Sequence, residues 1–198
     1  MVNAVLLLEQ PAKPNRSGHR IVFDAHAFAG QFSEVSELAV AAREKNIPVV
    51  VHEDPHKITA EHIEPGTDLI VTAHCHARVT PEALANSKLG GIGYHPSLLP
   101  RHRGIAAIEW TIKEKDPIAG GSIYHLAERM DAGALAAQDW CFVKKDEDAR
   151  SLWERALAPM GLKLLKQVVR QAADTGKIDA IPQQDEFATK APSLKKPA

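Results

Sequence analysis

The chain has few of the features that mark specialised classes of protein. Its 198 residues include two cysteines, Cys75 and Cys141, so no disulfide framework is available and a reducing compartment is expected. Aromatic residues make up 5% of the chain. No apolar run approaches the roughly 20 residues that a membrane-spanning helix needs. The net charge of −1 creates no field that would attract nucleic acid or an anionic membrane. The first eight residues also lack the basic region of a signal peptide. These absences predict a cytoplasmic protein that binds neither nucleic acid nor membrane.

The composition is otherwise that of an ordinary globular domain, with 44% hydrophobic and 25% charged residues. The length is sufficient for a single core. We therefore expect one catalytic domain over residues 1–180, with residues 181–198 as its polar C-terminal extension. Histidine is the one excess, with ten residues, and it raises the question of metal binding.

Short apolar runs alternate with helical patterns along the chain. Strands are expected at residues 2–8, 20–24, 47–51, 68–73, 91–95, 120–126 and 136–143, and helices at residues 32–45, 81–86, 105–115 and 148–175. The apolar run at 68–73 does not alternate with polar residues, which is typical of a strand buried in a parallel sheet. Pro159 should kink or split the last helix, and Gly176 should end it. The alternation predicts the α/β class with a doubly wound, mostly parallel sheet.

The most informative stretch runs from Gly90 to Gly104. The expected strand must end at His95, because Pro96 has no N–H for the ladder. Residues at the ends of strands in open α/β sheets reach the crevice where ligands bind. This position favours a functional role for His95 over that of an incidental histidine in a proline-rich connection.

The string Tyr-His-Pro-Ser-Leu-Leu-Pro-Arg-His-Arg-Gly at residues 94–104 resembles the 10-formyltetrahydrofolate-dependent formyltransferases. Four later segments resemble the parts that follow in this family: residues 107–110, 120–124, 130–134 and 184–192. The resemblance implies the formyltransferase fold with a Rossmann-like N-terminal half. It also implies an enzyme of one-carbon metabolism with 10-formyltetrahydrofolate as formyl donor and a small-molecule substrate. The hydrolase domain of 10-formyltetrahydrofolate dehydrogenase has the most similar motif.

The resemblance implies that His95 and Asp131 are the catalytic residues. An imidazole can donate a hydrogen bond to an oxyanion and move protons near neutral pH. A carboxylate beside it can fix the tautomer of the ring or orient a water molecule. Taken alone, Asp131 is also typical of a turn, and its position in the order of motifs favours the functional role.

The family's pterin pocket lies between the segment at residues 72–76 and the loop at residues 125–133. The expected folate-binding residues are therefore Ala73, His74, His76 and Gly133. His74 and His76 share one face of a strand and would also suit zinc, with Cys141 or His95 as a third ligand. The pair lacks the four-ligand spacing of a structural zinc site, so we expect no metal.

Two arginines follow His95 in the motif, Arg101 and Arg103. They would either neutralise the glutamate tail of a folate or another substrate anion, or remain solvated loop charges.

Two departures from the family pattern bear on activity. Gly93 stands where the family usually has asparagine, and losing one oxyanion donor costs about 2.7–4 kcal/mol of barrier. Substitute donors would be His74, His76 or Tyr94. Residues 2–20 also resemble the family's second strand and its loop, so the first strand–helix unit is expected to be truncated or replaced by residues 20–45. An uncovered sheet edge would favour a homodimer.

Three functions follow from these features. The first is formyl transfer from 10-formyltetrahydrofolate to an amine of a small molecule. The second is hydrolysis of 10-formyltetrahydrofolate, with water as acceptor. Gly93 favours this alternative, because the dehydrogenase's hydrolase domain also lacks the asparagine. The third is folate binding without turnover.

Overall fold

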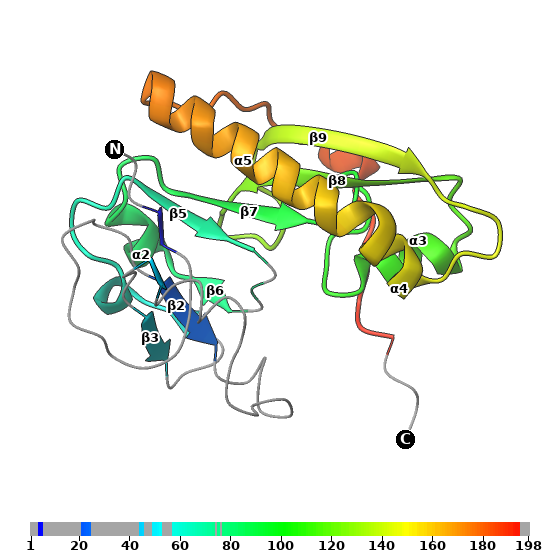
Figure 1. Cartoon of the computed structure of the whole chain (residues 1–198), viewed down its shortest axis with the longest axis horizontal. Coiled ribbons are helices and arrows are strands. Elements are labelled where there is room, and N and C mark those ends of the chain that lie inside the picture. Colours follow the sequence, from blue (N-terminus) through cyan, green and yellow to red (C-terminus); the bar gives the residue numbers. More distant parts are fainter. Residues whose placement is uncertain are drawn as a thin grey trace. The chain divides into compact units, whose positions relative to one another are not determined.

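The structure is a computed structural model that describes residues 4–5, 21–24, 44–45, 49–52, 57–73, 75 and 77–194. The chain divides into two compact units, residues 1–92 and residues 93–198 (Figure 1). It passes from the first unit to the second within one strand, β7 (Gly91–His95), which is the strand expected to carry His95.

Parallel strand pairs make up the first unit. In its main sheet β1 (Ala4–Val5) pairs with β5 (Leu69–Thr72), and β7 follows in the order β1-β5-β7. Two further parallel pairs are β2 (Ile21–Asp24) with β3 (Val49–His52) and β4 (Lys57–Ile58) with β6 (Arg78–Val79). The parallel arrangement expected from the apolar run at 68–73 is therefore present.

Short helical elements join these strands. A 3-10 turn (Ala60–His62) precedes β5, and α2 (Pro81–Ala85) precedes β7. Helix α2 begins where expected because the Thr80 hydroxyl accepts a hydrogen bond from the backbone N–H of Ala83 and Pro81 occupies the first turn.

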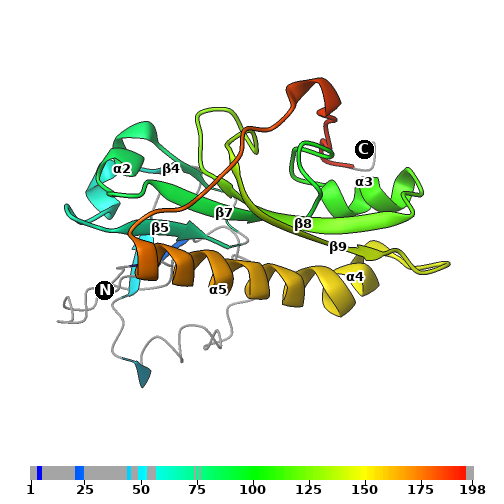
Figure 2. The ribbon, with the colours of Figure 1, turned by 90° about the horizontal axis from the view of Figure 1, so that it is seen from above.

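An antiparallel hairpin forms the sheet of the second unit. Strand β8 (Ile118–His125) pairs with β9 (Leu135–Phe142), and the order in this unit is β7-β8-β9. The short helix α3 (Ala107–Lys113) precedes the hairpin. Figure 2 shows α5 (Ala158–Thr175) along one face of the hairpin, with the segment after α5 crossing the other face.

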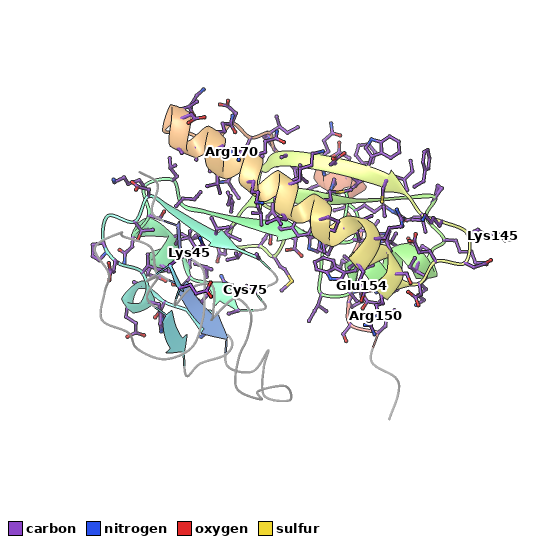
Figure 3. All side chains as sticks on the ribbon, in the orientation of Figure 1. Lys45, Cys75, Lys145, Arg150, Glu154 and Arg170 are labelled. Carbon is purple, nitrogen blue, oxygen red and sulfur yellow. The ribbon has the colours of Figure 1, made fainter. Side chains whose placement is uncertain are left out.

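The long C-terminal helix is broken one turn earlier than Pro159 suggested. It consists of α4 (Ala149–Leu152), a π-helical turn (Trp153–Leu157) and α5. The irregular turn directly precedes Pro159, which has no N–H to continue the α-helical ladder. Arg150 and Glu154 form an ion pair of 2.8 Å on the outer side of the break (Figure 3). Gly176 ends α5 as expected, with φ of 70° and its N–H donated to the carbonyl of Ala172.

The segment after α5 packs against the rest of the second unit. Its Ile181 exchanges two backbone hydrogen bonds with Leu135, of 2.7 and 2.9 Å. Farther along, Ala191 is fully buried and its N–H donates to the carbonyl of Arg103 at 2.7 Å. Although its composition is polar, this segment is held in place by backbone hydrogen bonds to β9 and to the loop after β7.

Some sequence-based predictions concern residues outside the described part. Residues 32–43 of the expected helix at 32–45 and most of the expected strand at 2–8 lie there. Among the described residues, no helix has both the length and the apolar character that crossing a membrane requires.

Candidate active site

His95 ends β7 with a buried side chain whose two ring nitrogens face different acceptors. Its Nε2 lies 2.8 Å from the carbonyl oxygen of His102. A carbonyl can only accept, so Nε2 carries a proton and donates it. Its Nδ1 lies 3.6 Å from Oδ2 of Asp131, beyond direct hydrogen-bond distance. The structure therefore brings the two expected catalytic residues together, with a small gap between them. Their catalytic role stays a prediction.

Asp131 is held in place by two donors. Its Oδ1 accepts from the hydroxyl of Tyr124 at 2.8 Å, and its Oδ2 accepts from the backbone N–H of Gly104 at 2.9 Å. Its φ is 53°, in the left-handed region that costs an L residue roughly 1–2 kcal/mol. A buried carboxylate needs such partners, and these two fix its orientation toward His95.

A fully buried serine anchors the loop that follows His95. The Ser122 hydroxyl donates to the carbonyl of Ser97 at 2.6 Å and accepts from the backbone N–H of Leu99 at 3.1 Å. The Gln138 side-chain amide donates to both the Ser122 hydroxyl and the Leu99 carbonyl, at 2.8 and 2.9 Å. Strands β8 and β9 thus hold the loop through a connected set of hydrogen bonds.

His102, whose carbonyl orients the His95 ring, is itself buried and contacts a partly exposed group of charged side chains. Its Nε2 lies 2.8 Å from Oδ2 of Asp116, and Arg101 donates to both oxygens of that carboxylate at 2.9 and 2.7 Å. Burial by itself would raise the pKa of Asp116. The hydrogen bonds from Arg101 and His102 outweigh burial and place this pKa below its ordinary value. The cluster keeps the His102 backbone, with its φ of 59°, in position.

His102, Glu114 and Asp116 also have ligand atoms within 4.8 Å of one another. Arg101 already pairs with both carboxylates, so the charge that a metal ion would neutralise is balanced by a guanidinium. The arrangement is that of a salt-bridge cluster.

The two arginines of the motif make internal ion pairs, which departs from both roles that the sequence left open for them. Arg101 binds Asp116 and Glu114, whereas Arg103 binds Gln183 and Asp185. Both guanidinium groups therefore stabilise the conformation of the loop that follows His95.

Tyr94 cannot replace the missing asparagine, because it faces away from His95. Its hydroxyl donates to the carbonyl of Leu157 at 2.7 Å, and its ring lies where a Cβ on Gly121 or Gly161 would collide with it. Successive strand residues point to opposite faces, so Tyr94 faces the C-terminal helix and His95 the other side. Burial raises the pKa of the Tyr94 phenol well above its ordinary value.

The expected folate-binding residues lie in different parts of the chain. Ala73 is exposed, one residue after β5, in the first unit. His74 and His76, with the zinc alternative that depended on them, lie outside the described residues. Gly133 is buried in the second unit, where a Cβ would overlap the carbonyl oxygen of His125. A role for these four residues in folate binding stays a prediction.

Three residues around the pair escaped the sequence analysis: Ser122, Tyr124 and Gln183. Ser122 and Tyr124 occupy alternate positions of β8 and so share one face of the strand. Polar residues at that spacing in an otherwise apolar strand were an available signal. Gln183 had none, because its partners lie 50, 52 and 80 residues earlier.

Comparisons with known proteins show the family of the chain. A family model described as "Formyl transferase" matches residues 26–169. Mitochondrial 10-formyltetrahydrofolate dehydrogenase of Mus musculus is 33% identical over 181 residues, covering 88% of this chain and 19% of that protein. The cytosolic 10-formyltetrahydrofolate dehydrogenase of Homo sapiens is 39% identical over 132 residues, covering 67% and 14%. The chain therefore spans about a fifth or less of the length of these relatives.

A solved structure shows the same fold. The N-formyltransferase of Helicobacter canadensis, in complex with folinic acid and dTDP-3-aminofucose, matches with a TM-score of 0.72 and 15% sequence identity. The match covers 97% of this chain and 71% of that one.

Proposed function

Because the chain belongs to the formyl transferase family of enzymes, we propose that it takes a formyl group from 10-formyltetrahydrofolate and transfers it to an amine of a small molecule. The observation that carries this proposal is the buried pair at the end of β7, with His95 Nδ1 and Asp131 Oδ2 3.6 Å apart. An imidazole and a carboxylate in this arrangement suit a reaction in which an oxyanion forms and a proton moves.

The chemistry is balanced without a further reactant. The amine nitrogen attacks the formyl carbon, the bond from that carbon to folate N10 breaks, the amine loses a proton and N10 gains one. We assign the transfer of the proton to Nδ1 of His95, which takes the proton from the amine, donates a hydrogen bond to the oxyanion while protonated, and passes the proton to N10; Nε2 stays bound to His102. His102 holds the ring through Nε2, and Asp131 faces Nδ1. The 3.6 Å gap is suited to a bridging water or to closure on substrate binding, since catalytic contacts often tighten only then.

A second candidate is hydrolysis of 10-formyltetrahydrofolate to formate and tetrahydrofolate. Gly93 favours it through the resemblance of the motif to a hydrolase domain that also lacks the asparagine, and Tyr94, which is bound to Leu157 on the other face of the strand, does not supply the missing donor. The identity to two 10-formyltetrahydrofolate dehydrogenases also favours it. In this reaction water takes the place of the amine, and the same two residues would act.

Incubation of the protein with 10-formyltetrahydrofolate, with and without a panel of amines, separates these functions. Tetrahydrofolate released only with an amine supports transfer, and release in water alone supports hydrolysis. Binding without release contradicts both and leaves a folate-binding protein.

The His95→Ala variant tests the site itself. It should lower the rate by at least about 100-fold, because it removes the only imidazole that faces Asp131 among the described residues. An unchanged unfolding midpoint would show that the loss is chemical. A rate within a few-fold of the original would place the active site elsewhere. Cytoplasmic location and a homodimer stay predictions, which cell fractionation and light scattering would test.

A further inference from the structure

In the segment after α5, the side chain of Gln183 binds the backbone of the Asp131 loop directly. Its side-chain NH₂ group donates two hydrogen bonds, to the carbonyl of Asp131 at 2.8 Å and to the carbonyl of Gly133 at 2.7 Å. Its side-chain oxygen accepts from Arg103, whose Nε lies 3.0 Å away. Every polar atom of this amide therefore has a partner in the second unit.

These partners determine which residue type fits. Backbone carbonyls only accept and a guanidinium only donates, so the amide has a single orientation that satisfies all of them. Glutamate would keep the bond to Arg103 but present an acceptor to two carbonyls. Methionine would have a similar length and lose all of these bonds.

Gln183 also connects the two loops that carry the site. Arg103 belongs to the loop after His95, and the two carbonyls belong to the loop of Asp131. Asp185 strengthens this connection, because it pairs with Arg103 at 2.8 Å and with Arg129 at 2.7 Å. The Asp131 backbone has a left-handed φ, a conformation that needs support from its surroundings.

We propose that Gln183 is a positioning residue that holds the Asp131 loop against the His95 loop, and so sets the distance between imidazole and carboxylate. Its catalytic consequence rests on the proposed function, whereas its hold on the loop does not. The expected effect of its loss is a looser loop and a slower reaction.

Three variants test this inference: Gln183→Met, Gln183→Glu and, as a control, Gln184→Met. Gln184 is the exposed neighbour of Gln183 in the same segment. The first readout is hydrogen exchange, followed by mass spectrometry, of the peptide that covers residues 129–135. The second is the steady-state kinetics of tetrahydrofolate release. Thermal unfolding confirms that each variant is folded.

Both Gln183 variants should exchange the 129–135 amides about tenfold faster, with kcat lowered about tenfold and KM for the folate changed less than threefold. Gln184→Met should match the original protein in both measurements. Unchanged exchange in Gln183→Met would overturn the inference. A Gln183→Glu variant that behaves like the original protein would also overturn it, because the bond to Arg103 would then be sufficient. Faster exchange of the loop with an unchanged kcat would overturn it as well. A parent protein that releases no tetrahydrofolate refutes the proposed function, and the exchange data then decide whether Gln183 holds the loop.

Discussion

The two tyrosines of the chain allow a matched test of the site, because each donates one hydrogen bond to a known oxygen. Tyr124 donates to the carboxylate of Asp131 at 2.8 Å, and Tyr94 donates to the backbone carbonyl of Leu157 at 2.7 Å. Replacing either residue with phenylalanine removes one oxygen atom and leaves the ring. One acceptor belongs to the expected catalytic pair, whereas the other lies on the opposite side of the strand.

The nature of the acceptor determines the size of each effect. A hydrogen bond to a charged group contributes about 1.5–3 kcal/mol to stability, and one between neutral groups about 0.5–1.5 kcal/mol. Tyr124→Phe should therefore lower the free energy of unfolding by the larger amount and Tyr94→Phe by the smaller. If the hydrogen bond from Tyr124 to Asp131 stabilises the transition state by the same free energy, Tyr124→Phe should also lower kcat roughly 10- to 100-fold, since 1.36 kcal/mol corresponds to a factor of ten.

Urea unfolding followed by circular dichroism gives the two free energies, and the initial rate of tetrahydrofolate release gives kcat. Tyr94→Phe should retain the rate of the original protein within about twofold, because its hydroxyl does not contact the site. An equal loss of rate in Tyr94→Phe and Tyr124→Phe would refute the role given to the Tyr124 hydroxyl, and so would a Tyr124→Phe variant that is stable and fully active.

Two further predictions concern the supports of the site. Gly133→Ala should abolish folding of the loop or of the whole second unit, because the new Cβ would overlap the His125 carbonyl oxygen; a normal melting temperature and rate would contradict this. Asp116→Asn should be less stable than the original protein, by an amount that depends on pH. The folded-state pKa of Asp116 is lowered, so its contribution is complete above the ordinary value near 3.8 and is lost as the pH falls through the folded value. The difference in unfolding free energy should therefore be largest above about pH 5 and shrink below about pH 4, and a difference that grows in acid would contradict the lowered pKa.

The part of the fold that local chemistry determines could be predicted from the sequence. Strand β7 ends at His95 because Pro96 cannot donate to the ladder, and α5 ends at Gly176 because a left-handed residue was needed there. The neighbourhood of His95 and Asp131 was inferred from the order of motifs. Periodicity alone gives no distance between residues 36 positions apart.

The parts that could not be predicted depend on long-range contacts. The ion pairs of Arg101 and Arg103, which the sequence left as either anion-binding groups or solvated loop charges, could not be predicted because their partners, Asp116 and Asp185, lie 15 and 82 residues later. The paired strands β4 and β6 have two residues each, too few for a periodic pattern to show. The π-helical turn before Pro159 was missed because helical periodicity does not distinguish an α-helix that is broken at proline from one that widens before it.

The full burial of Ala191 limits where the chain can be truncated or fused to another domain. A boundary drawn at Gly176 would keep every long helix and strand of the second unit intact. It would nevertheless remove the backbone that pairs with Arg103 and Leu135, together with the amide that bridges the two loops. Such a fragment would have a near-normal circular dichroism spectrum and a disorganised His95–Asp131 pair, so a partner domain or affinity tag should be attached after Pro192, whose carbonyl still accepts from the Trp110 side chain, and not at Gly176.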